Sequence, residues 1–197
     1  MEDSMDTVIV VVIVIVVAVA VAAAVLHRRR RSNQLKQRFG PEYERAVEET
    51  ADRREAEKDL LSRQKRRSGF EVTPVTGQDA SRYRQEWVEI RQGFVDKPAE
   101  AVDRADRLVV QIMRDSGYPV DDFEHRVEDI SVDHPEVAQY YREAHLVAVA
   151  QDAGTADTEQ LRQAVTACGQ LVDALLRESQ SPDRRGEQGS SDDREHT

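Results

Sequence analysis

Residues 8–26 read VIVVVIVIVVAVAVAAAVL, an unbroken apolar run of 19 residues, and the basic sequence HRRRR follows at 27–31. A bilayer core about 30 Å thick requires roughly 20 apolar residues in a helix. Val and Ile are mediocre helix formers in water, but a lone strand in hydrocarbon would leave its backbone polar groups unpaired. The run therefore predicts one transmembrane helix at 8–26.

The charges on either side of this run predict its orientation. Glu2, Asp3 and Asp6 precede it with no Lys or Arg, and four arginines at 28–31 follow it. Basic flanks stay on the cytoplasmic side of a membrane. We therefore expect a single-pass protein of the cell membrane, with residues 1–7 extracytoplasmic and the C-terminal domain in the cytoplasm.

A cleaved secretory signal is the alternative to an anchor. Small residues at 18–20 and 22–24 form patterns that a signal peptidase could cut. A signal peptide, however, has a basic N-terminal region and an apolar region of about 7–15 residues. This N-terminus is acidic and the run is longer, so an uncleaved anchor is the preferred interpretation.

The charge distribution limits the partners that the chain can bind. The net charge is −10, and the acidic excess falls in residues 71–178, which argues against nucleic acid. Basic residues gather instead at 28–31 and again at 63–67. They suit either lipid head groups or the setting of membrane topology, and we favour topology. Cys168 is the only cysteine, so no intramolecular disulfide is possible.

The segment after the anchor is rich in charge. Residues 27–40 form a basic juxtamembrane segment that ends at Gly40-Pro41. Residues 41–68 contain no further Gly or Pro and predict one long charged stalk helix, since proline suits the first position of a helix. Its apolar residues are too sparse to indicate a coiled coil strongly, so a solvated stalk is favoured. Residues 69–78 predict an extended linker.

Residues 79–178 contain five amphipathic segments separated by turn residues. The first carries Tyr83, Trp87, Ile90 and Phe94 at helical spacing. Short connections between such helices imply a compact bundle of about five short helices, and hence an all-α fold. Residues 179–197 contain no apolar side chain and predict a disordered tail. Expected helix caps are Asp96, Asp121, Ser131 or Asp133, and Thr155 or Asp157.

The chain contains no recognisable catalytic or phosphate-binding motif. Acidic and histidine side chains do cluster between residues 121 and 145, and such groups bind divalent metals when they converge. Their positions suit helix caps and solvated faces instead, although helix packing could bring His134 and His145 together. We therefore expect no catalytic, cofactor-binding or metal-binding residue and no enzyme activity. The cluster comprises Asp121, Asp122, Glu124, His125, Asp129, Asp133, His134, Glu136 and His145.

Other conspicuous side chains are better explained by packing than by chemistry. Trp87 and Cys168 lie on apolar stripes, where a free cysteine behaves as a small hydrophobic residue. The aromatic residues of the second half of the domain are likewise predicted to form core and not a ligand site. This aromatic set is Tyr118, Phe123, Tyr140 and Tyr141.

Three short stretches carry a resemblance: RFGPEY at 38–43, GYPVDDFE at 117–124 and SVDHP at 131–135. They resemble an uncharacterised family of actinobacterial single-pass membrane proteins, often labelled "secreted", over most of residues 7–178. Arg outnumbers Lys 24 to 4, which fits a GC-rich coding bias. The resemblance implies one N-terminal anchor followed by a helical domain, and it implies no functional residue.

These observations predict a membrane-anchored helical protein-interaction module whose partner is another protein. Two alternatives remain. One is a metal-binding protein or enzyme that uses the Asp/His cluster, and the other is an extracytoplasmic secreted helical domain.

Overall fold

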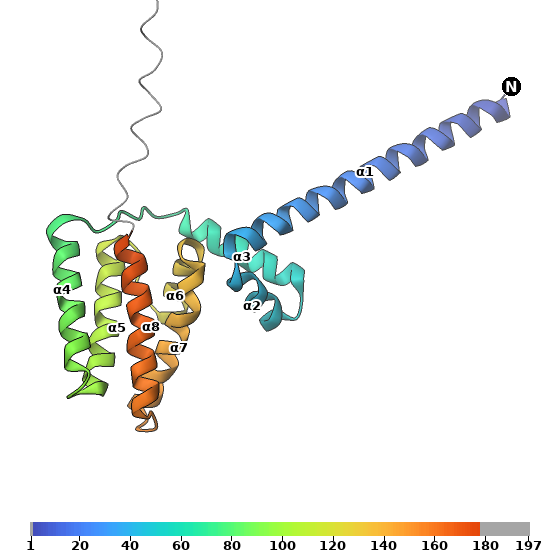
Figure 1. Cartoon of the computed structure of the whole chain (residues 1–197). Helices are drawn as coiled ribbons and strands as arrows, with labels where there is room; N and C mark the ends of the chain where they lie inside the picture. The colour runs from blue at the N-terminus through green and yellow to red at the C-terminus, as the bar shows by residue number, and fades with distance from the viewer. Residues whose placement is uncertain (1, 178–197) are drawn as a thin grey trace, which may run out of the picture. The chain divides into compact units, whose positions relative to one another are not determined.

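The computed structural model describes the backbone of residues 2–177 and the side chains from Ile15 onward. The tail predicted at 179–197 and the side chains of the first part of the apolar run lie outside the described residues. Within the described residues the chain forms eight helices and no strand (Figure 1). The fold is therefore all-α, as the sequence predicts. The chain divides into two compact units, residues 1–61 and 62–197.

Helix α1 (Glu2–Phe39) is continuous from the N-terminal region through the arginines (Figure 1). The juxtamembrane segment at 27–40 is thus an extension of the same helix, which ends where Gly40 adopts a φ of 48°. Within the stretch whose side chains are described, none of the helices combines the length and the apolarity needed to cross a bilayer.

The prediction of a single stalk helix at 41–68 is wrong. The chain forms α2 (Pro41–Thr50) and α3 (Arg53–Arg67), and Ala51 between them has a φ of 53°. Two local hydrogen bonds stabilise the break: the Thr50 hydroxyl donates to the Asp52 carbonyl at 3.0 Å, and Asp52 Oδ1 accepts the Arg54 N–H at 2.8 Å. Such side-chain bonds compete with helix continuation.

The break lets the ends of the three helices share a small core. Six apolar side chains of the first unit are buried, and four of them belong to the segment that was predicted to be a solvated stalk. The six are Leu35, Phe39, Tyr43, Ala46, Ala56 and Leu60.

The five amphipathic segments correspond to five helices of the second unit: α4 (Gly77–Gly93), α5 (Pro98–Asp115), α6 (Phe123–Asp133), α7 (Pro135–Asp152) and α8 (Thr158–Arg177). Helix α8 packs against both α5 and α7, while α4 contacts α5 and α8, and α6 lies on α7 (Figure 1). The elements form one helical bundle around α8.

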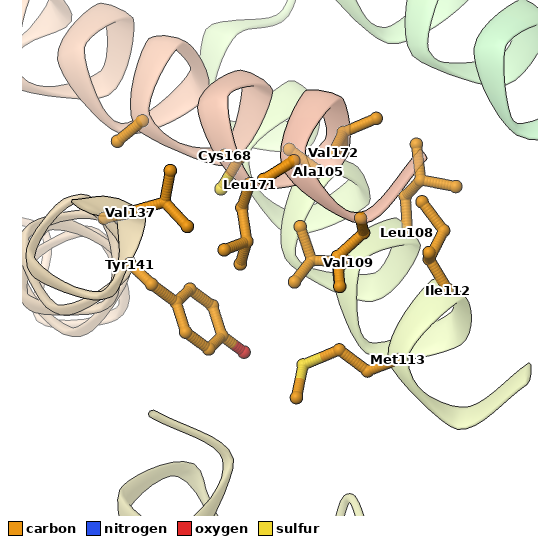
Figure 2. Close-up of a cluster of buried hydrophobic side chains, with 14 of the residues drawn as sticks. Ala105, Leu108, Val109, Ile112, Met113, Val137, Tyr141, Cys168, Leu171 and Val172 are labelled. Atoms are coloured by element: carbon orange, nitrogen blue, oxygen red, sulfur yellow. The ribbon is translucent and has the colours of Figure 1, made fainter. Parts of the chain in front are cut away.

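The core of this bundle lies where α5, α7 and α8 pack against one another. Figure 2 shows Val109 and Met113 of α5, Tyr141 of α7 and Leu171 of α8 turned toward one another. All four side chains are fully buried. Burying a side chain of this size contributes about 1.5–3 kcal/mol, so the three apolar stripes explain why these helices pack together.

The helix caps are the least accurate part of the sequence prediction. Asp122, not Asp121, caps α6 by accepting the His125 N–H at 2.9 Å. Lys97 and His134, not Asp96, Ser131 or Asp133, occupy the N-cap positions of α5 and α7, and neither side chain forms a cap hydrogen bond. Pro98 and Pro135 are the first residues of those helices, a position that proline favours. At α8, Asp157 and Gln160 exchange reciprocal bonds of 2.8 Å, which is a capping box.

Candidate functional site

The exposed apolar surface of α1 is the first candidate site. From Ile15 to Leu26 every residue is exposed, and the larger apolar side chains are each 46–63% accessible. A helix that is apolar all round cannot hide its surface by packing one face on a core. Arg28 to Arg31 follow on the same helix and are also exposed. Residues 15–26 therefore form a helix that exposes apolar side chains on all sides. We call the four arginines that follow it, Arg28 to Arg31, the basic collar.

A polar network anchors the other end of α1 to α3. Glu57 Oε1 accepts hydrogen bonds from Ser32 Oγ at 2.5 Å, Tyr43 OH at 2.9 Å and Arg53 Nε at 3.0 Å. Burial would raise the pKa of Glu57, but these three donors together lower it below the ordinary value. The carboxylate thus remains charged at neutral pH and fixes Arg53 in place.

The arginines of the second basic cluster, at 63–67, form ion pairs with acidic residues of α6. Arg66 bonds Glu128 at 2.7 Å and Asp129 at 2.9 Å, and Arg67 pairs with Asp133. Burial raises the pKa of Asp129, while the hydrogen bond from Arg66 opposes that rise. These ion pairs connect the C-terminal end of α3 to α6. The charges of Arg66 and Arg67 are therefore paired with acidic groups of their own unit.

The predicted Asp/His cluster resolves into separate local contacts. Within residues 15–177 the structure contains no group of three or more His, Cys, Asp or Glu side chains placed to hold a metal ion. The His125 ring pairs with Asp122 at 2.5 Å on the surface, where that hydrogen bond raises the pKa of His125. His145 stacks on Phe123, with ring centroids 3.6 Å apart.

The remaining members of the cluster have structural positions. His134 is buried at the junction of α6 and α7, with Nδ1 3.9 Å from Glu136. Asp133 accepts a hydrogen bond from Tyr118 at 2.6 Å in addition to its pairing with Arg67. Asp121 and Glu124 are exposed. The described contacts do not bring His134 and His145 together.

Most of the cysteine and aromatic side chains that the sequence predicted to be packing residues are buried or half-buried. Cys168 is buried, and burial raises the pKa of its thiol to about 12, so it is a poor nucleophile. Tyr118 and Tyr141 are buried, but Tyr140 is 45% exposed and its assignment to the core was wrong. Trp87 is only half-buried and lines a hollow of about 390 Å³ between α4 and α8.

An exposed apolar stripe on α7 escaped the sequence prediction. Leu146 and Val149 are 67% and 53% exposed. Ala150, which is half-buried, and Ala153, the residue just after α7, follow them at helical spacing. The opposite face of α7 is buried against the bundle through Val137 and Tyr141 among others. The uninterrupted apolar run at 146–150 was the available clue, because one buried stripe does not require five consecutive apolar residues.

Comparison with known proteins adds no assignment, since no protein-family model, curated protein or solved structure matches the chain. The actinobacterial resemblance therefore remains a prediction.

Proposed function

We propose that the protein is a single-pass membrane protein whose helical domain binds another protein at the cytoplasmic face of the membrane. The observation that supports the anchor is the apolar surface of α1 from Ile15 to Leu26, which no other described element covers. The sequence continues the same composition back to Val8. Water is an unfavourable environment for such a helix, and the hydrocarbon core of a bilayer is a favourable one.

The orientation follows from the charges. Translocation of four consecutive arginines is costly, so Arg28 to Arg31 stay in the cytoplasm together with the chain that follows them. In this arrangement helices α2 and α3 follow the proposed anchor in the sequence, and the five-helix bundle comes after them. We propose that the bundle is the part that binds a soluble partner.

The stripe of Leu146, Val149, Ala150 and Ala153 supports the interaction role. Leu146 and Val149 are large apolar side chains exposed on one face of an otherwise acidic domain, and covering them with a protein partner would remove this apolar surface from water. A partner helix with small or apolar residues at matching positions would cover it, and charged residues around the stripe would select the partner by complementarity.

Alkaline extraction tests the anchor. Membranes from cells that express the full chain are washed with carbonate, and a chain that lacks residues 2–26 is the control. We expect the full chain to stay with the membrane pellet and the shortened chain to be released. Release of both by carbonate or by high salt would refute the anchor, because an electrostatically bound protein leaves when charge is screened.

Site-specific photo-cross-linking tests the interaction surface. A photoreactive residue replaces Leu146 in one variant and Gln85, an exposed position on α4, in the matched control. We expect a discrete cross-linked product in cells from position 146 and none of the same mass from position 85. Absence of a specific product at 146, with the variant stable and at the membrane, would refute this surface.

A further inference from the structure

The first unit contains a pocket immediately after the apolar part of α1. Its volume is about 430 Å³, which falls in the range of small-ligand sites. Val25, Arg28, Arg29 and Ser32 of α1 line one side, and Arg53 and Arg54 of α3 line the other. Two elements thus bring four guanidinium groups to one concave surface.

The charges of this pocket favour an anion. Asp52 and Glu57 also line it, but both carboxylates already accept hydrogen bonds within the unit. Asp52 accepts the N–H of Arg54, and Glu57 accepts hydrogen bonds from Ser32, Tyr43 and Arg53. The four arginines therefore outnumber two carboxylates that are already engaged.

Three of the four arginines remain available to a ligand. Arg53 bonds Glu57 and Tyr43, whereas Arg28, Arg29 and Arg54 form no side-chain hydrogen bond or ion pair with any described residue. A guanidinium group presents its donors in a planar fork that matches the oxygen atoms of a phosphate. The guanidinium groups of Arg28, Arg29 and Arg54 therefore give this pocket the hydrogen-bond donors and positive charge that bind a phosphate.

The depth of the pocket along α1 indicates the source of that phosphate. Val25 belongs to the apolar run and Ser32 lies seven residues further, which is about 10 Å along a helix. The polar head-group layer adds roughly 5–8 Å to each side of a bilayer core. If α1 spans the membrane as proposed, the pocket starts at the hydrocarbon boundary and covers the depth of the head groups.

We propose that this pocket binds the phosphate of an anionic phospholipid head group in the cytoplasmic leaflet. The proposal rests on the proposed membrane anchor. It differs from a general attraction between the basic collar and anionic lipid, because it assigns binding to Arg28, Arg29 and Arg54 and not to Arg30 and Arg31.

Lipid binding to the full chain in neutral detergent micelles tests the assignment. Dioctanoyl phosphatidylglycerol is the probe, dioctanoyl phosphatidylcholine is the zwitterionic control, and bound lipid is counted by native mass spectrometry. We expect saturable binding of one phosphatidylglycerol per chain, at least roughly tenfold tighter than phosphatidylcholine, a difference that corresponds to about 1.4 kcal/mol. No saturable binding, or equal binding of the two lipids, would overturn the proposal.

Two double variants with the same net charge separate the pocket from the collar. Arg28→Gln/Arg29→Gln removes pocket arginines, and Arg30→Gln/Arg31→Gln removes two that do not line it. We expect the first to weaken binding by roughly tenfold and the second by less than about threefold. Arg54→Gln, on α3 and outside the collar, is expected to weaken binding several-fold, with unchanged helix content by circular dichroism. Equal losses in both double variants, or no effect of Arg54→Gln, would contradict the pocket.

Soluble competitors distinguish a lipid from a free phosphate ligand. Inorganic phosphate and glycerol phosphate are expected to displace phosphatidylglycerol only at far higher concentration. Displacement at a concentration similar to that of the lipid would overturn the lipid assignment in favour of a soluble phosphate compound. The micelle assay does not depend on insertion in cells, so failure of the anchor in the extraction experiment and failure of the pocket in this one are separate results.

Discussion

Gly117 shows most clearly how a single residue determines local structure. Its φ is 93°, and a Cβ at this position would lie 2.5 Å from the carbonyl oxygen of Glu71. The segment that follows α3 is close here because Thr73 N–H donates to the Ser116 carbonyl at 2.9 Å. The segment predicted as a linker is therefore packed on the end of α5, a contact that depends on glycine having no side chain.

Gly117→Ala is expected to destabilise the protein by about 2–4 kcal/mol, because the new methyl group strains a positive φ and collides with backbone. Urea unfolding monitored by circular dichroism measures this. Gly93→Ala is the control, since nothing lies within 4 Å of a Cβ there and its φ is not positive. Equal stability of the Gly117 variant and the wild type would contradict the packing of the 69–76 segment.

The buried carboxylate of Asp129 gives a second residue-scale prediction. Asp129 is 1% exposed and its one described hydrogen-bond partner is Arg66. Arg66→Gln should cost about 2–4 kcal/mol, because it leaves a buried charge without compensation. Adding Asp129→Asn should recover most of this loss. A double variant no more stable than Arg66→Gln alone would contradict the account.

This pair also predicts a pH dependence. Burial raises the pKa of Asp129 in the folded state, and loss of Arg66 should raise it further. A raised carboxyl pKa means that the folded state binds the proton more tightly, so stability falls as pH rises through that pKa. The deficit of Arg66→Gln should therefore be largest at neutral pH and shrink on acidification toward pH ~4, as urea unfolding at several pH values would measure. A deficit independent of pH would exclude the charge as its cause.

At the scale of helices, hydrophobic periodicity predicted the bundle well and the first unit poorly. The stripes of α5 and α8 are long and regular, and their residues are buried as expected. Between residues 41 and 68 the pattern was too sparse to show where the helix breaks, because the break depends on the side chains of Thr50 and Asp52 and on a core shared with α1. The α7 stripe was missed because a pattern of apolar residues does not reveal which of two faces packs inward.

The contact between α4 and α8 depends on Gly169. A Cβ there would lie 2.7 Å from Trp87 Cζ2, so alanine forces the indole ring to move. Gly169→Ala should destabilise the wild type by about 1 kcal/mol, the net of overpacking and improved helix propensity. In a Trp87→Leu background the same change should stabilise by about 0.5–1 kcal/mol. A double-mutant cycle measures both effects, and the same sign in both backgrounds would contradict this contact.

At the scale of the whole molecule, the sequence could predict an apolar segment and a helical bundle but not the long-range contacts that hold each unit together. The apolar run and the five stripes are properties of composition and spacing, whereas Arg66 and Arg67 pair with residues about sixty positions away. Such long-range pairs leave no local pattern. The lipid pocket was equally hidden, because its arginines come from two helices that meet only after the chain turns at Ala51.

These long-range pairs predict where the second unit begins. A fragment of residues 62–197 includes Arg66, Arg67 and the packed segment at 69–76, and it should be soluble and predominantly helical. A fragment that starts at residue 79 loses those contacts and should unfold at a clearly lower temperature. Thermal unfolding by circular dichroism compares them, and identical melting temperatures would show that the α3 end contributes nothing.

Protease accessibility of a C-terminal tag tests both the proposed membrane anchor and its proposed orientation. The full chain carries an epitope tag after Thr197, and intact cells are treated with an external protease before and after permeabilisation of the membrane. We expect a membrane-bound tag that is protected in intact cells and digested after permeabilisation, because basic flanks such as Arg28 to Arg31 favour the cytoplasmic side. Digestion of the tag in intact cells would contradict the orientation, and a protected tag in the soluble fraction would contradict the anchor.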